Sequence, residues 1–378
     1  MNTITRKIQI IPTENVKETY IQLYKWNEIV FRAANTASSH LYFQENMKQF
    51  FYLTERGKIL FSDIAKADVE KDKGAERVLT TSPQNTTYQV VSTEFKKQLP
   101  SDIFANLNNQ LYSTFKKESK EYFSGKRSLR SYKRNIPMPF SFSSMRNFTP
   151  NEDNRNFNFD IFGLKMRTHF GRDLSGNRTI FERGLSGEYK FCNSSIQLDG
   201  KKIFLLAVFQ FKSEAITLDK SKTIYASLTP KFPIQLTSGT KTFYIGEKNE
   251  YLHGRRAIQA SLRNAQKAAS FTSGGKGRNK KMKSIEHYNK KESNYISTKQ
   301  HQYTSKMIDY CIETKSGNLI LQMTPEPPDF SDMTREEASA WKNENQILLR
   351  NWGYRGLLEK IQYKAKIAGI AVQIEKDK

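Results

Sequence analysis

The chain has 378 residues, and its 61 Lys and Arg against 38 Asp and Glu give a formal net charge of +23 at pH 7. A hydrophobic fraction of 37% with 12% aromatic residues is enough to form cores in two or three domains, which excludes global disorder. No run of about 18 apolar residues occurs, so the sequence excludes a membrane span. The N-terminal residues lack the apolar core of a signal peptide, and we expect a cytoplasmic protein.

Two cysteines and five histidines are scattered along the chain. Cys192 and Cys311 each lack a partner at metal-ligand spacing, so no zinc ribbon can be built from them. In a reducing compartment a disulfide between them is unexpected, and we predict that both lie in cores. The sequence therefore predicts no metal site and no cofactor.

The first third of the chain predicts one strand followed by helices. Residues Thr5–Pro12 alternate apolar and polar side chains, which is typical of a strand. From Val16 to Tyr52 apolar residues recur at intervals of three and four, as in packed helices. Residues 55–85 are charged and polar and indicate a loop. A second helical pair is expected over Thr86–Phe123, broken near Pro100.

After Gly125 the pattern changes to short strands separated by turns, which favours a small antiparallel barrel. We expect the strand Thr5–Pro12 to join this barrel, so that the intervening helices are an insertion. The predicted barrel strands lie within three segments: Asn156–Phe170, Arg178–Arg183 and Gly187–Phe211.

From Thr217 onward the pattern is strand, hairpin, helix, strand, helix and strand, which is ribonuclease-H-like. A glycine-rich loop at Gly274–Gly277 is expected to lead into a helix that begins near Ser284. The other predicted elements are the strands Thr223–Leu228, Phe232–Leu236, Lys241–Ile245 and Leu319–Met323 and a helix through Leu357 and Ala368.

Two clusters of cationic residues mark candidate nucleic-acid contacts. Either cluster alone would be interpreted as a solvated charged loop. Two clusters together with a net charge of +23 favour a long polyanion, whose binding would weaken steeply with salt. The clusters are Arg127, Arg130, Tyr132, Lys133 and Arg134, and Lys276, Arg278, Lys280, Lys281 and Lys283, with Arg255 and Arg256 on the helix before the second.

Five stretches, in this order, carry a family resemblance: Ser131–Pro137, Leu185–Tyr189, Gly274–Lys283, His301–Asp309, and Asn351–Tyr354 continuing to Ile370. In these stretches the chain resembles the miniature type V-F CRISPR effectors and their transposon relatives, the TnpB nucleases. The resemblance covers about residues 125 to 370.

The resemblance implies an α+β multidomain fold. Residues 1–12 and 126–216 would form a discontinuous wedge barrel of oligonucleotide-binding type, and residues 13–125 an inserted helical recognition domain. Residues 217–378 would form a truncated RuvC domain, ribonuclease-H-like and lacking the zinc ribbon. It also implies nucleic-acid contacts at Asn351, Trp352 and Tyr354, and recognition of a short DNA motif by the segment with Asn85, Thr87, Tyr88 and Gln89.

The family's nuclease centre needs three carboxylates to hold two divalent ions. By resemblance, Ser227 and Gln322 occupy the positions of the first two acids, and the third lies beyond Lys378. We therefore expect a nuclease that has lost its chemistry and is no longer an enzyme. The alternative is that displaced acids restore cleavage, namely Asp219, Glu326 or Asp329.

The resulting hypothesis is RNA-guided binding of double-stranded DNA without cleavage, by a bacterial, nucleoid-associated protein that controls transcription. Its expected partners are a guide RNA, the target DNA, a second copy of the chain, and a sigma factor with RNA polymerase, docked on the acidic segment Pro325–Glu344. The alternatives are repression by promoter occupancy, an active guided nuclease, and an unguided RNA-binding or RNA-modifying protein.

Overall fold

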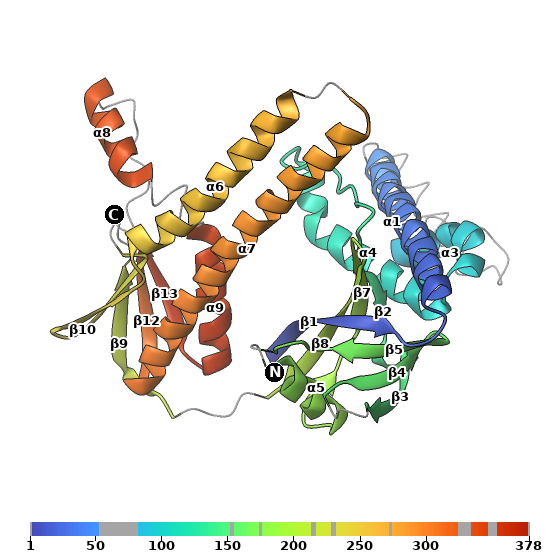
Figure 1. Cartoon of the computed structure of the whole chain (residues 1–378), viewed down its shortest axis with the longest axis horizontal. Helices are drawn as coiled ribbons and strands as arrows, with labels where there is room; N and C mark the ends of the chain where they lie inside the picture. The colour runs from blue at the N-terminus through green and yellow to red at the C-terminus, as the bar shows by residue number, and fades with distance from the viewer. Residues whose placement is uncertain are drawn as a thin grey trace. The chain divides into compact units, whose positions relative to one another are not determined.

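The computed structural model describes residues 2–52, 82–151, 155–173, 176–212, 217–227, 232–271, 274–323, 334–346 and 354–376. The chain forms two compact units, Met1–Lys212 and Ser213–Lys378 (Figure 1). The predicted loop at 55–85 lies almost entirely outside the described residues. No helix in the described part of the chain is long and apolar enough to cross a membrane.

The first unit is built on a curled antiparallel sheet with the strand order β2-β7-β8-β1-β5-β4-β3, and β6 pairs with β8. The N-terminal strand β1 lies between β8 and β5, which confirms that it joins the later strands in one sheet. The strands are β1 (Asn2–Pro12), β2 (Met138–Phe140), β3 (Met145–Pro150), β4 (Phe157–Ile161), β5 (Leu164–His169), β6 (Lys190–Phe191), β7 (Ser194–Asp199) and β8 (Lys202–Phe211).

Apart from α5, the described helices of this unit lie between β1 and β2, which agrees with the predicted insertion of helices into the barrel. They are α1 (Val16–Tyr52), α3 (Pro83–Phe95), α4 (Ser101–Phe123) and α5 (Asn177–Leu185), with short 3-10 turns at η1 (Lys96–Gln98) and η2 (Phe142–Ser144). The predicted strand at Arg178–Arg183 is wrong, because these residues belong to α5. The carboxylate of Asp173 accepts hydrogen bonds of 2.7 Å from the main-chain N–H groups of Asn177 and Arg178, which starts a helix there.

Helix α1 packs one face mainly against α3 and α4, and its N-terminal half also reaches the sheet. Ile29, Ala33 and Ala37 are buried as the periodicity predicted, whereas Ile21 and Tyr24 are exposed. The turn between β4 and β5 fastens the sheet to this helix, because Phe162 in that turn packs edge-on against Trp26 with ring centroids 5.9 Å apart.

The second unit contains a five-stranded sheet with the order β11-β10-β9-β12-β13. Strand β12 pairs in parallel with both β9 and β13, while the β9-β10-β11 meander is antiparallel. The order of strands and helices agrees with the one that the sequence predicted. The strands are β9 (Asp219–Ser227), β10 (Ile234–Ser238), β11 (Lys241–Ile245), β12 (Ser316–Met323) and β13 (Ala371–Lys376).

One face of this sheet is covered by α7 (Gly275–Glu313) and α9 (Tyr354–Ala368), which share a core with alternate residues of β9 and β12. The remaining helices are α6 (Lys248–Ser270) and α8 (Arg335–Gln346). The predicted glycine-rich loop is wrong, because the chain is already helical from Gly275. The predicted core residues Leu357, Ile361 and Ala365 of α9 are all buried.

Both cysteines are free thiols. Cys311 lies in the core of the second unit, as predicted, whereas Cys192 is only half-buried. Among the described residues, no group of three or more His, Cys, Asp or Glu side chains is placed to hold a metal ion.

A close contact in the first unit gives a test of its packing. A Cβ atom at Gly184 of α5 would lie 2.5 Å from ring atoms of Phe191 and Phe209, both held in the aromatic core. We expect Gly184→Ala to lower the free energy of unfolding by about 1–3 kcal/mol, measured by urea denaturation. The control is Gly274→Ala, where a Cβ meets nothing within 4 Å; an equal decrease in both variants would contradict the packing argument.

Candidate nucleic-acid interface

The first predicted cluster lies on an irregular segment, residues 126–137, which we call the basic strap. It connects α4 to β2 and contains no helix or strand. Three polar side chains of α1 bind its main chain over distances of 2.9 to 3.3 Å: Asn27 to Ile136, Asn35 to Tyr132, and Ser38 to Arg130. The main chain of the strap is therefore fixed by α1 at three places.

Four cations of the strap are exposed, namely Lys126, Arg127, Lys133 and Arg134, and Arg127 among them is paired with carboxylates of α4. The Arg134 side chain is 77% exposed, even though it makes an ion pair of 3.4 Å with Glu28. Tyr132 is half-buried and packs against the core of the first unit. The strap therefore offers Lys126, Lys133 and Arg134 and one partly accessible aromatic ring to a partner.

A groove of about 460 Å³ runs between α4 and the strap. Its lining combines amide, hydroxyl and cationic side chains with apolar residues, among them Leu107 and Leu111. Hydrogen-bonding groups next to exposed cations suit a phosphate and the sugar or base attached to it. The polar lining residues are Gln110, Thr114, Arg130, Ser131, Tyr132, Lys133, Asn135 and Gln197.

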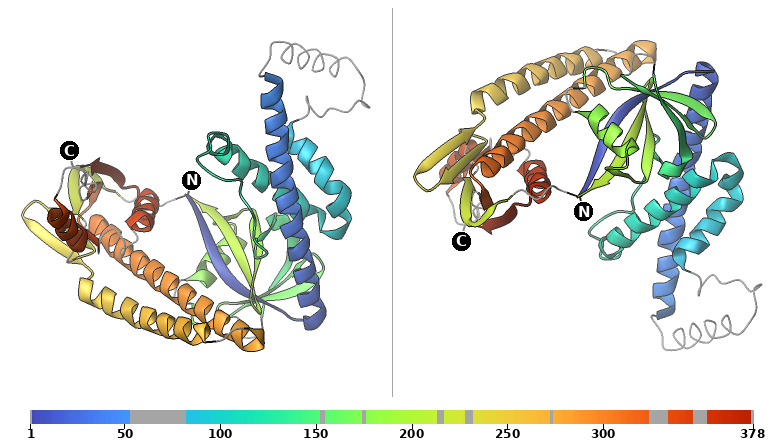
Figure 2. Two further views of the ribbon diagram at one scale, coloured as in Figure 1. Left: turned by 90° about the horizontal axis from the view of Figure 1, so that it is seen from above. Right: turned by 90° about the horizontal axis from the view of Figure 1, so that it is seen from below.

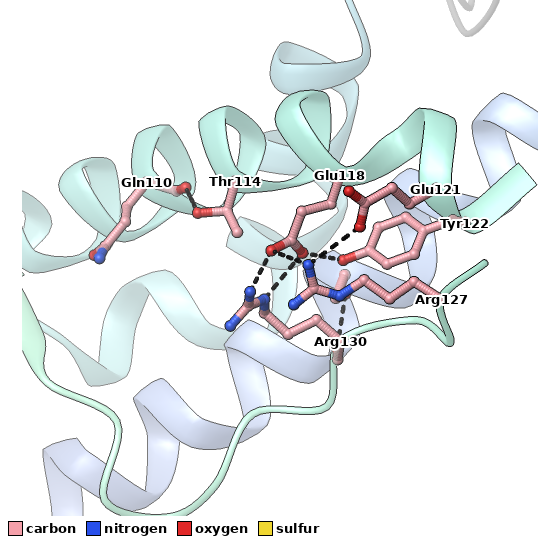
Figure 3. Close-up of polar contacts among 8 residues, drawn as sticks. Gln110, Thr114, Glu118, Glu121, Tyr122, Arg127 and Arg130 are labelled. Atoms are coloured by element: carbon pink, nitrogen blue, oxygen red, sulfur yellow. Dashed lines mark hydrogen bonds and ion pairs between the residues drawn. The ribbon is translucent and has the colours of Figure 1, made fainter. Parts of the chain in front are cut away.

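The other two arginines of this cluster are held by carboxylates of α4 (Figure 3). Arg130 binds Glu118 through two nitrogen atoms, and its Nε lies 3.0 Å from Glu118 Oε2. Arg127 lies 3.1 Å from the same carboxylate and 3.5 Å from Glu121. The hydrogen bond from Arg130 lowers the pKa of Glu118 from 4.5 to about 2. Arg127 and Arg130 thus help to fasten the start of the strap to α4.

Replacing the half-buried carboxylate of Glu118 tests this role. We expect Glu118→Gln to lower the free energy of unfolding by about 1–3 kcal/mol at pH 7, because two guanidinium groups lose their anionic partner. The folded-state pKa lies below the ordinary value, so the carboxylate stabilises the fold above about pH 4.5. The difference from wild type should shrink as the pH falls from 4.5 towards about 2.

Urea denaturation at several pH values provides the measurement. Glu121→Gln is the matched control, since the Glu121 side chain is 54% exposed and its ion pair is long. We expect it to change stability by less than about 0.5 kcal/mol. A Glu118→Gln difference that does not depend on pH would contradict the role given to the charge.

The predicted motif-reading segment lies on α3. Thr87 is fully buried and binds Gln44 over 2.9 Å, so it cannot contact DNA. Tyr88 packs edge-on against Phe104 with ring centroids 5.0 Å apart, and its ring is only partly accessible. Asn85 and Gln89 are exposed and lie one turn apart, so they share a helix face.

The second cluster lies on a long antiparallel helix pair, α6 and α7, which run side by side away from their sheet (Figures 1 and 2). We call residues 263–291 the basic arm. At 1.5 Å per residue, the 39 residues of α7 span about 58 Å. None of the described residues of the basic arm is buried, so the arm has no core of its own.

Charge in the basic arm is strongly one-sided. It carries nine Lys and Arg and a single carboxylate, Glu286. Lys276, Lys280 and Lys283 are exposed at intervals of four and three residues, which places them on one face of α7. Cations in the first turns of a helix face the positive end of its dipole, which destabilises the free protein. A bound polyanion would remove that cost.

Other predicted cations differ in accessibility. Arg278 is exposed, whereas Lys281 donates a hydrogen bond of 2.8 Å to the carbonyl of Ala268 and so joins α7 to α6. Arg255 makes an ion pair of 2.8 Å with Glu292 and is only 14% exposed, so we leave it out of the interface. Arg256 is exposed on α6.

The uncovered face of the second sheet carries a row of polar residues, one from each strand. Ser227 and Gln322 are direct partners on β9 and β12, so the structure brings these two sequence positions together. Glu375 on β13 is the partner of Gln322, and it is a carboxylate that the sequence analysis did not consider. The full row is Tyr244, Gln235, Ser227, Gln322 and Glu375.

Asn351 and Trp352 lie outside the described residues, as do Glu326 and Asp329. Tyr354 begins α9. Asp219 begins β9, and its carboxylate binds Ser221, while its main-chain N–H binds Lys315. It lies at the end of β9 opposite to Ser227, far along the strand from the polar row.

Sequence reasoning missed the three residues of α1 that hold the strap. Asn27, Asn35 and Ser38 are separated by eight and three residues, which places polar groups on one helix face. That spacing was a readable signal of a polar contact, although it could not identify the contacting segment.

The chain is homologous in sequence and fold to the Cas12f1 proteins, which are related to TnpB. It is 27% identical over 329 residues to a CRISPR-associated endodeoxyribonuclease Cas12f1 of Sulfoacidibacillus thermotolerans, which covers 82% of this chain and 74% of that protein. No protein-family model matches the chain.

A second relative and one solved structure agree with this similarity. The Cas12f1 endodeoxyribonuclease of Syntrophomonas palmitatica is 26% identical over 210 residues, or 52% of this chain and 40% of that protein. A cryo-EM structure of a Cas12f1–sgRNA–target DNA complex matches with a TM-score of 0.61 and 15% identity, and covers 98% of this chain and 88% of that chain. The structural likeness supports the shared fold.

These names contradict one prediction from the sequence. Both relatives are endodeoxyribonucleases, which are enzymes, so the prediction that this chain is not an enzyme is wrong by this comparison. The prediction relied on Ser227 and Gln322 at two acid positions and on a third acid expected beyond Lys378. It did not consider carboxylates that the fold brings beside them, such as Glu375.

Proposed function

We propose that the chain binds a guide RNA and, through base pairing of that RNA, recognises double-stranded DNA. The observation that carries the proposal is the basic arm, with nine cations and one carboxylate on a helix pair that has no core of its own. The names of the relatives support the same function, since CRISPR-associated nucleases and an sgRNA–DNA complex are what the chain resembles.

The basic strap forms the second part of the proposed interface. Its backbone is held by α1 and its cations are exposed beside a polar groove, so it can order phosphates with little loss of conformational entropy. In this proposal the protein holds the RNA by its backbone, and pairing supplies the sequence. The wedge, recognition and RuvC assignments of the domains are part of the same proposal.

The direct experiment is to sequence the RNA that copurifies with the expressed full-length chain. We expect a defined scaffold joined to a variable segment. The purified complex should then shift a matched duplex in a gel assay, and cleavage is followed in the same reaction with Mg²⁺. Heterogeneous cellular RNA would contradict guided recognition and favour an unguided RNA-binding protein.

The lysine face of the arm gives a quantitative prediction. We expect Lys276→Ala, Lys280→Ala and Lys283→Ala combined to weaken RNA binding. A plot of the logarithm of the RNA association constant against the logarithm of the salt concentration should become less steep. Its slope should change by about 0.7 for each phosphate that the variant no longer neutralises. Thermal stability should stay the same or rise slightly, because the cations face the helix dipole.

Glu286→Gln is the matched control of opposite sign, since it removes the arm's only carboxylate. It should tighten RNA binding. An unchanged salt dependence in the triple variant would mean that these lysines form a solvated surface and do not contact RNA.

Transcription control is a finer part of the proposal. The support is the acidic first turn of α8, where Glu336 and Glu337 are exposed on an otherwise basic chain. Such a helix suits a basic protein surface, and a sigma factor acting with RNA polymerase is the partner proposed from the resemblance. Copurification of these proteins with the wild-type complex, and its loss on Glu336→Gln with Glu337→Gln, tests this part. Mass measurement of the same complex reports one or two copies per RNA.

A further inference from the structure

The tip of the basic arm exposes an aromatic ring that the proposed function does not yet use. Phe271 directly follows the last residue of α6 and is 87% exposed, the largest fraction among the exposed large hydrophobic side chains of the described residues. Moving a phenyl ring out of water lowers the free energy of the system. A ring left this open at the end of a projecting helix pair therefore indicates a binding partner.

The surroundings of Phe271 indicate the chemistry of that partner. Nine cations and one carboxylate make the arm complementary to a polyanion. A membrane surface would also attract cations, but it requires an apolar stripe along the helix. Between Lys276 and Lys283 the only apolar side chain is Met282, and three lysines occupy one face. An aromatic ring beside cations spaced along a helix suits a nucleic-acid strand better.

The local structure holds the ring in place. Lys281 of α7 binds the carbonyl of Ala268 in the last turn of α6, and Ser270 Oγ donates a hydrogen bond of 2.7 Å to the carbonyl of Lys267. These contacts hold the end of α6 one to three residues before Phe271. The ring is thus presented from an ordered helix end, so little entropy is lost when it binds.

We propose that Phe271 is a base-stacking residue: its ring stacks on an unpaired nucleotide of the bound RNA, while Lys276, Lys280 and Lys283 contact phosphates of the same RNA. The inference rests on the proposed RNA binding and adds a subsite to it. Stacking accepts any base, because every base has a π face, so the site selects unpaired nucleotides without selecting their sequence.

The test compares wild type with Phe271→Ala on three RNA probes. The first is single-stranded oligo(U) and the second is the copurifying RNA. The third is an RNA dumbbell, a duplex whose two ends are closed by caps so that every base is paired. We expect the affinity of Phe271→Ala for oligo(U) to fall by about 5- to 100-fold. The salt slope should not change, because the variant keeps every cation that faces a phosphate. Binding to the dumbbell should not change either. Phe271→Trp should restore the affinity for oligo(U).

Met282→Ala is the matched control, since Met282 is an apolar side chain of the same arm and is 44% exposed. It should bind all three probes like wild type. The Lys280→Ala variant should show the converse pattern, a flatter salt slope on single and paired RNA alike.

The possible results separate the two proposals. Wild type that binds none of the RNA probes overturns the proposed function. Wild type that binds RNA while Phe271→Ala binds equally well overturns only the stacking inference. The stacking inference is also overturned if Phe271→Ala loses as much affinity for the dumbbell as for oligo(U). It is overturned as well if the protein associates with anionic vesicles through Phe271 and does not bind oligo(U).

Discussion

Excess positive charge is the constraint on which the rest of this structure depends. A chain with a net charge of +23 must either pair its cations internally or leave them for an anionic partner, and this fold does both. Carboxylates hold several arginines inside the units: Glu118 binds Arg127 and Arg130, and Glu292 binds Arg255. Arginine suits this structural use, because its planar guanidinium makes two hydrogen bonds to one carboxylate. The lysines of the basic arm stay on the surface, and they are the charges that the proposed RNA would neutralise.

The two basic surfaces are built on different principles. The strap has no regular structure, yet its backbone is held by Asn27, Asn35 and Ser38 of a helix that also packs on the sheet. The arm is regular but has no buried residue among those described between positions 263 and 291. The strap can therefore order a ligand locally, whereas the arm would gain stability from its ligand. The hydrogen bonds that hold the strap join it to α1, which is distant in the sequence, and the hydrogen bond from Lys281 to Ala268 joins the two facing helices of the arm.

In the second sheet, the pairing register of the strands decides which residues become neighbours. Ser227 and Gln322 are about a hundred positions apart, and parallel pairing makes them neighbours. The same pairing brings Glu375 beside Gln322. A prediction from two substituted positions was not sufficient to decide the enzyme class, and the relatives contradict it. The polar row across all five strands appears only when the register of the whole sheet is known.

The sequence by itself determined the order and type of most elements, because hydrophobic periodicity is a local property. The strand at Thr5–Pro12, the boundaries of α1, the break at Pro100 and the apolar face of α9 all follow from it. It also identified both basic clusters and the family resemblance. It failed where local composition competes with tertiary contacts: glycines suggested a loop where α7 is already helical at Gly275, and Asp173 starts a helix where a strand was predicted. Only the tertiary structure decided which cations are engaged and which are open, since Lys281 and Arg255 look the same as Lys280 and Arg256 in the sequence, and the partners that hold them lie on the facing helix.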